Sequence, residues 1–137
     1  MLVAQGLSDA EQFATAAVQK CVKVYEDATG EKVIGPTDLK PDADGNLIKV
    51  YEGIQDRCRE LGLFKQIAEK AGANLTNDTW VAAVNSFGTI EVVGNKFASL
   101  KEGKYDTSDG FRLASFDSSI APFGDFKALS DFVDVTK

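Results

Sequence analysis

The longest regular pattern of hydrophobic positions lies near the middle of the chain, over residues 46–72. Apolar side chains recur there at steps of three and four residues, the spacing that places them on one face of a helix. They are Leu47, Val50, Tyr51, Ile54, Cys58, Leu61, Phe64, Ile67, Ala68 and Ala71. A turn signal at residues 44–46 precedes the pattern, and Gly72 follows it as a helix stop. We therefore predict one long amphipathic helix over residues 46–72.

A second helical pattern precedes this one and begins at a clear N-terminal signal. Ser8 and Glu11 have the spacing of a capping box, in which each side chain accepts a hydrogen bond from the backbone N–H of the other residue. The helix is predicted to end at about Ala28, because Gly30 follows closely. Its expected apolar face consists of Phe13, Ala17, Cys21, Val24 and Ala28, widened by Ala14, Val18 and Tyr25.

A third, shorter helix is predicted after Thr76, which has the side chain of a good N-cap residue. We expect Gly88 to stop it. Its apolar face would contain Trp80, Val81, Val84 and Phe87.

The connection before the long helix is read as a loop. Its residues 42–46 have a composition typical of calcium loops, but the spacing would place Tyr51 at the bidentate ligand position, so a plain turn is the simpler interpretation.

The pattern changes after Gly88, where short extended segments alternate with glycine-containing turns. We expect strands at residues 90–93, 96–100, 111–116 and 132–135, whereas residues 1–7 look like an irregular lead-in. The chain is thus expected to form one domain, residues 1–137, that contains both helices and strands. Its residues 1–88 would be helical, with two long helices and one short, and residues 89–137 rich in strands.

The composition narrows the chemistry that this domain can perform. The sequence contains no histidine, which removes the commonest general base, Ser-His and Cys-His pairs, and nearly all zinc and copper sites. Its net charge of −6 and its scattered basic residues argue against nucleic acid and anionic membranes as partners. The apolar runs are too short for a membrane span. We expect no catalytic residue, no metal, no cofactor and a protein that binds rather than reacts.

Carboxylates and aromatic rings offer weaker alternatives. The acidic residues between 106 and 134 are Asp106, Asp109, Asp117, Asp125, Asp131 and Asp134. A pair of them could perform acid–base hydrolysis, although aspartate is common in turns for local reasons. The same region holds the aromatic residues Phe97, Tyr105, Phe111, Phe116, Phe123, Phe126 and Phe132. They suit a ligand wall, but core packing or contact with another lobe explains them more simply.

The two cysteines, Cys21 and Cys58, are both predicted to lie on the apolar faces of their helices. The spacing leaves two readings open. As free thiols they would behave as small buried hydrophobic groups. As a disulfide they would close a loop of 38 residues, counting both cysteines. The chain-entropy model assigns roughly 4 kcal/mol of stabilisation to a loop of that length.

Several segments, taken in their order and spacing, resemble a known family. They are residues 18–30 (VQKCVKVYEDATG), 58–64 (CRELGLF), 68–76 (AEKAGANLT) and 103–113 (GKYDTSDGFRL). They are similar to the C-terminal portion of the type I periplasmic solute-binding proteins of ABC transporters, the branched-chain amino-acid-binding family. In that family two helices can carry paired cysteines, an AAxxAGxxLT segment introduces a further helix, and a GKYD turn leads into a closing strand.

The resemblance implies a two-lobe, three-layer α/β/α receptor without enzymatic activity. Such a receptor closes on a small amino-acid-like or amide ligand and delivers it to an ABC permease. It implies a periplasmic or cell-surface location, compatible with a lipoprotein anchor on the full-length protein. That location favours the Cys21–Cys58 disulfide over the free thiols.

The resemblance covers only part of such a receptor. Family members are considerably longer, and the polar anchors of their ligand lie largely upstream of the similar segments, so the ligand-binding residues here are left unknown. We expect the chain to pair with a missing N-terminal portion or to self-associate, because isolated lobe segments expose apolar surface. The alternative is a stand-alone, disulfide-stapled α+β interaction module without a small-molecule site.

Overall fold

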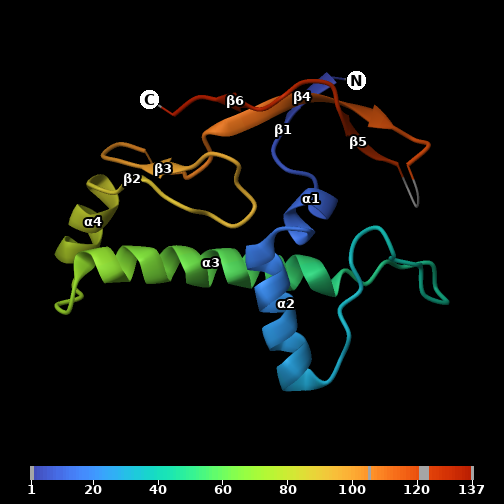
Figure 1. Cartoon of the computed structure of the whole chain (residues 1–137), viewed down its shortest axis with the longest axis horizontal. Helices are drawn as coiled ribbons and strands as arrows, with labels where there is room; N and C mark the ends of the chain where they lie inside the picture. Colours follow the sequence, from blue (N-terminus) through green and yellow to red (C-terminus); the bar gives the residue numbers. More distant parts are fainter. Residues whose placement is uncertain (1, 105, 121–123, 137) are drawn as a thin grey trace.

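The computed structural model describes residues 2–104, 106–120 and 124–136. A long helix, α3 (Val50–Ala71), runs across the molecule, and α2 (Ala16–Thr29) crosses it (Figure 1). Helix α4 (Asn77–Asn85) lies at one end of α3, on the same side of α3 as the strands, and α2 extends to the other side. The chain is therefore a mixed helix and strand structure.

Helix α3 matches the predicted long helix except at its start, where the structure begins at Val50 instead of residue 46. The Asp42 carboxylate explains the difference, because it accepts hydrogen bonds from the backbone N–H groups of Asp44 and Asn46 and holds these residues in a turn. At the other end Gly72 adopts a φ of 83°, a conformation that glycine reaches without strain. The predicted stop is confirmed.

The predicted first helix is two helices in the structure, α1 (Asp9–Phe13) and α2. The capping box of Ser8 and Glu11 is confirmed at the start of α1. Thr15 makes the break, because its hydroxyl donates to the Gln12 carbonyl and accepts from the Val18 backbone N–H, which starts a new helix. A single helix over this region was therefore a wrong prediction.

The buried face of α2 also differs from the expected one. Val18 is 0% exposed, whereas Val24 on the expected apolar face is 64% exposed. Phe13 and the buried Tyr51 of α3 pack in one cluster with Val18 and Val22, which turns this edge of α2 inward. Apolar residues at helical spacing thus remain on the surface of α2.

Helix α4 begins as predicted, with Thr76 and Thr79 forming a capping box. It ends at Asn85, earlier than expected, and Gly88 starts a strand instead. Its buried residue is Ala83 rather than Val81, which is exposed. Helices α3 and α4 share a core with the segment that follows, made of Ile67, Ala83, Ile90, Val92, Ala98 and Leu100.

The strands agree with the prediction in part. The pieces predicted at 96–100, 111–116 and 132–135 contain strands, but residues 90–93 contain none, because the chain turns there with the Asn95 N–H donating to the Val92 carbonyl. Three strands were missed, at Leu2–Gln5, Gly88–Thr89 and Asp125–Ala128. The described strands are β1 (Leu2–Gln5), β2 (Gly88–Thr89), β3 (Ser99–Leu100), β4 (Gly110–Asp117), β5 (Asp125–Ala128) and β6 (Val133–Asp134).

Strand β4 organises the larger sheet. It pairs antiparallel with β1, β5 and β6, while β2 and β3 form a separate two-stranded ladder. Residues 1–7 were expected to be irregular, but residues 2–5 form β1. The strand was missed because its partner lies near the other end of the sequence, with Leu2 opposite Ser115. No local pattern signals such a pairing.

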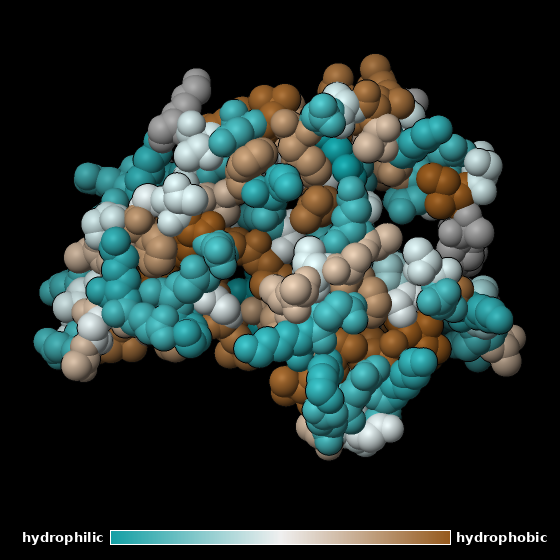
Figure 2. Space-filling view, viewed as in Figure 1, coloured by the Kyte–Doolittle hydropathy of each residue, from teal (hydrophilic) through white to brown (hydrophobic). Residues whose placement is uncertain are grey.

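Strand β4 buries a charged side chain and exposes large apolar ones, the reverse of the usual arrangement. Arg112 and Ala114 are buried, whereas Phe111 and Leu113 are exposed. Arg112 is accommodated inside because its guanidinium forms a bidentate ion pair with the Glu11 carboxylate and stacks on the Phe132 ring. Figure 2 shows hydrophobic side chains along the outer side of this sheet.

Within the described ranges, no helix combines the length and hydropathy needed to cross a membrane.

Candidate functional site: the disulfide-linked helix pair

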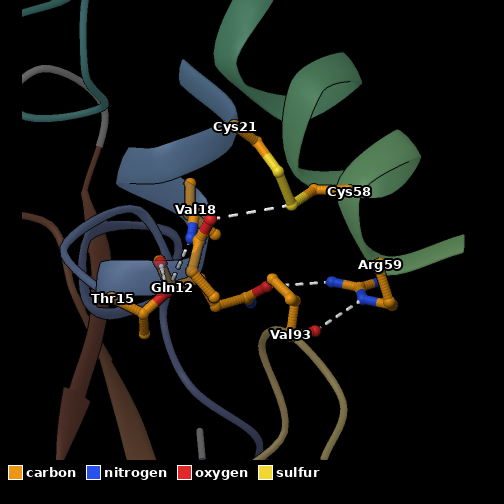
Figure 3. The surroundings of a disulfide bond; sticks show 8 residues. Gln12, Thr15, Val18, Cys21, Cys58, Arg59 and Val93 are labelled. Carbon is orange, nitrogen blue, oxygen red and sulfur yellow. Dashed lines mark hydrogen bonds between the residues drawn. A yellow bond between two sulfur atoms is a disulfide. The ribbon is translucent and has the colours of Figure 1, made fainter. Parts of the chain in front are cut away.

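Cys21 of α2 and Cys58 of α3 form a disulfide, with their Cα atoms 6.2 Å apart (Figure 3). The bond joins the helices where they cross, so it fixes their relative position directly. Of the two readings that the spacing left open, the structure contains the bonded one. Disulfides of this kind persist in oxidising compartments and are rare in the cytosol.

A hollow of about 500 Å³ lies on one side of α3, between the helix and residues 89–98. We call it the polar hollow after Arg59 and Gln66, which reach across a lining that is otherwise largely apolar. Arg59 crosses it: its Nε donates to the Val93 carbonyl at 2.9 Å and its Nη2 donates to Gln12 Oε1 at 2.9 Å (Figure 3). Two turns further along α3, Gln66 Nε2 donates to the Glu91 carbonyl at 2.7 Å. The polar side chains of this side thus hold the 89–98 segment against the helix.

These contacts engage the Arg59 guanidinium. A site for a small acidic ligand needs a cation whose donors are available. The Arg59 guanidinium instead directs its donors to Val93, Gln12 and, at 3.4 Å, the Asp56 carboxylate. Its arrangement therefore serves to bind α1, α3 and the 89–98 segment together.

An apolar groove of about 590 Å³ lies on the opposite side of α3, along the line where α2 crosses it. The disulfide forms part of its floor. Figure 2 shows hydrophobic side chains reaching the surface beside α2. The groove is lined by Cys21, Val24, Tyr25, Ala28, Val50, Gly53, Ile54, Arg57, Cys58 and Leu61. Leu61 is 69% exposed, so the groove leaves large apolar side chains in contact with solvent.

Gly53 leaves a gap in the row of side chains that lines this groove. A Cβ atom built at Gly53 would have no neighbour within 4 Å. Glycine inside a helix costs about 1 kcal/mol relative to alanine. The part of the chain that the structure describes makes no close approach to Gly53 that would explain this cost.

Most of the acidic residues considered for catalysis have local hydrogen-bond partners, among them Asp106, Asp117, Asp125 and Asp134. Asp109 is buried, accepts a hydrogen bond from Ser99 Oγ at 2.5 Å and lies 3.4 Å from Lys104 Nζ. Hydrogen bonds from Ser119 lower the pKa of Asp117, and those from Thr136 lower the pKa of Asp134. These contacts organise turns and the core. No group of three or more potential metal ligands was found in the described residues.

The ion pair between α1 and β4 has the clearest electrostatic signature. The Arg112 hydrogen bonds, assisted by those of Ser8, lower the pKa of Glu11 to about 2, against the opposing effect of burial. Nearby, burial and then the Asp9 carboxylate raise the pKa of the Tyr51 hydroxyl above its usual range. The Tyr51 hydroxyl donates to Asp9 Oδ2 at 3.1 Å, so α1 is anchored to the sheet on one side and to α3 on the other.

The aromatic residues considered as a ligand wall are spread over several places. Phe116 packs edge-on against Phe126 with ring centroids 5.7 Å apart, and Phe132 packs on Arg112. Phe97 lines the polar hollow. Tyr105 and Phe123 lie outside the described residues. The described rings therefore pack at the sheet or along separate elements instead of surrounding one cavity.

Sequence reasoning identified the two cysteines but missed Arg59, Gln12 and Gln66. All three side chains donate to backbone carbonyls, which carry no residue-specific signal in the sequence. Comparison of the chain with models of protein families, with curated proteins and with solved structures found no match in any of the three.

Proposed function

We propose that this chain is the C-terminal portion of an extracytoplasmic solute-binding protein that serves an ABC importer. The observation that carries the proposal is the Cys21–Cys58 disulfide. It joins the two helices that contain the family-like segments 18–30 and 58–64, as paired cysteines do in the family that the sequence resembles. The bond also suits a periplasmic or cell-surface location.

The exposed apolar surface supports the view that the chain works as part of something larger. Phe111, Leu113 and Val133 are all exposed, and they lie on β4 and β6. Single exposed apolar side chains are ordinary, but faces with several of them mark places where other protein packs. A receptor with a further N-terminal portion would supply such packing partners, and its permease would be a second partner.

In this proposal the complete receptor binds a small amino-acid-like or amide solute and does no chemistry on it. Most of the anchors for that solute would lie in the N-terminal portion, as in the family. The use of Arg59 to hold Val93 and Gln12 in place supports this division, because the most prominent cation of the polar hollow has a structural role.

The test is solute binding by the product of the complete reading frame, measured by calorimetry and thermal unfolding. The panel would contain leucine, isoleucine, valine, urea, small amides and aromatic acids, with residues 1–137 alone as the control. We expect one class of solute to bind the complete product. At 100 times the dissociation constant it should add about 2.7 kcal/mol of stability. The control should not shift.

Two outcomes would overturn the proposal. One is a complete product that binds no solute of the panel. The other is a 137-residue chain that unfolds cooperatively by itself, starts naturally at residue 1 and responds to no solute. The second result would favour the disulfide-stapled interaction module.

A further inference from the structure

The outer face of α3 presents a regular apolar stripe that no described part of the chain covers. Val50, Gly53 and Leu61 lie along it, next to the exposed Val24 of α2. Both walls of the groove are helices whose backbone groups are already hydrogen-bonded, so a partner can be recognised only through side chains and shape. The disulfide keeps the two walls at a fixed distance, and the groove is therefore preformed.

We propose that this groove is the docking surface for a second copy of the same chain. In the resulting dimer the two α3 helices pack antiparallel across a two-fold axis near Arg57. An interface of this kind uses the same patch on both copies, so the patch must be complementary to itself. Shape and charge along α3 both meet this requirement.

The shape requirement is met by Gly53 and Leu61. Gly53 leaves a hollow, because a Cβ atom there would have no neighbour within 4 Å, and Leu61 is a large side chain that is 69% exposed. They lie at equal distances along the helix on either side of Arg57. In the antiparallel dimer, Leu61 of each copy therefore fills the hollow at Gly53 of the other copy.

The charge requirement is met by Arg57 and Glu60. Their side chains are 76% and 60% exposed and form an ion pair within α3 at 2.5 Å. In an antiparallel pair, the order of these charges is reversed on the second helix. Arg57 of each copy then comes within one helical turn of Glu60 of the other, so each of the two Arg57 side chains that meet near the axis has a carboxylate beside it on both helices.

The charge of the rim also favours a second copy over a strongly charged partner. The α2 wall carries the exposed pair Lys23 and Asp27, and the α3 wall carries Arg57 and Glu60. The rim is thus balanced, although the whole chain has a net charge of −6. Two copies that repel each other overall can approach most easily through a face where both signs are present. This inference stands on the groove alone and does not depend on the proposed function.

The first test uses two glycines of α3 that face opposite sides. Gly53→Leu fills the hollow, whereas the matched control Gly62→Leu places the same side chain on the side of the polar hollow. Neither position has a neighbour within 4 Å of the added Cβ atom. Analytical ultracentrifugation of the 137-residue chain over a range of concentrations measures the dimer. We expect Gly53→Leu to weaken dimerisation at least about tenfold, and Gly62→Leu to leave it unchanged.

The second test exchanges the charges. Arg57→Glu should weaken the dimer, and the double variant Arg57→Glu with Glu60→Arg should restore it, because the pairs across the axis re-form with reversed signs. Circular dichroism and thermal unfolding of dilute samples confirm that the variants fold. As an independent readout, the disulfide should be reduced more slowly at high protein concentration, since the groove that contains it is then covered.

Three outcomes would overturn the inference. The first is a wild-type chain that stays monomeric at all concentrations, and the second is a dimer that Gly53→Leu leaves intact. The third is a monomeric product of the complete reading frame in which Leu61, replaced by cysteine, resists alkylation. That result would mean that another part of the longer protein covers the groove.

Discussion

The two sides of α3 use the same helix for opposite purposes. On one side Arg59 and Gln66 bind the backbone of residues 89–98, and Ile67 enters a core shared with α4. On the other side the crossing with α2 leaves an apolar groove that holds the disulfide and the exposed Leu61. The first side is complete within the described chain, whereas the second has apolar surface left over.

The difference shows that hydrophobic periodicity alone does not identify the interior of this protein. The most exposed apolar residues of α3 belong to the same periodic stripe as its buried ones. Hydrogen bonds from polar side chains stabilise the side of α3 that faces residues 89–98, which we call the closed side. On the groove side, which we call the open side, the packing of α2 on α3 depends on the disulfide. Predictions that treat the two sides differently can therefore be tested one by one.

The largest effect is expected when the disulfide is removed. Cys21→Ala with Cys58→Ala opens a loop whose ends are 37 positions apart in sequence. The free energy of unfolding should fall by roughly 4 kcal/mol, because the unfolded chain regains the freedom of that loop. Urea denaturation measures the change. Reduction of the wild-type protein should give a similar loss, and an unchanged midpoint would contradict the crosslink's role.

The next largest effect separates the two sides of α3 directly. Ile67 is 4% exposed. Ile67→Ala should lower the free energy of unfolding by about 3 kcal/mol, because the change leaves a cavity in the core shared with α4. Leu61→Ala is the matched variant on the open side. Below the concentration at which copies associate, it should change stability by no more than about 0.5 kcal/mol. Equal losses would show that the groove is closed in solution.

Two arginines of α3 give a smaller contrast. Arg59→Met removes donors to the Val93 carbonyl and to Gln12, and we expect a loss of about 2 kcal/mol because hydrogen bonds from a charged group are broken. Arg57→Met removes an exposed ion pair and should cost less than about 1 kcal/mol in the monomer. Thermal unfolding of both variants decides the point. A larger loss for Arg57→Met would reverse our assignment of the two sides.

The smallest effect concerns the ion pair that holds α1, and with it Gln12, in place. The pKa of Glu11 is about 2 in the folded protein against an ordinary value of 4.5. A lowered pKa means that the stabilisation is present above pH 4.5 and is lost as the pH falls towards 2. Since Glu11 is partly exposed, we expect about 1 kcal/mol. Glu11→Gln should remove this part of the acid dependence, whereas Glu60→Gln should retain it.

Features that depend on neighbouring residues could be predicted from the sequence. The caps at Ser8 and Thr76 and the stop at Gly72 were correct because a few consecutive residues determine each of them. The positions of the cysteines on two long helical segments were also visible. The break at Thr15 was missed, since threonine inside an apolar pattern is compatible with a continuing helix.

Features that depend on distant contacts could not be predicted. The side of α2 that carries Val18 is buried because it packs with Tyr51 of α3. The burial of Arg112 depends on its ion pair with Glu11. The Arg59 contacts end on a backbone carbonyl and on Gln12, neither of which has a pattern that marks it in advance. The two-lobe, three-layer arrangement remains a proposal, and the coarse mixture of helices and strands is what the structure supports.

The pairing of β1 with β4 has a consequence for biosynthesis. Leu2 meets Ser115, so β1 cannot pair with β4 until residues as far as Ser115 have left the ribosome. Closing so long a loop slows the formation of the sheet, while the helices can form early from local contacts. During that interval the edge of β1 is unpaired and prone to associate with other chains. Such a delay would make this protein a natural client for chaperones that shield strands as they emerge.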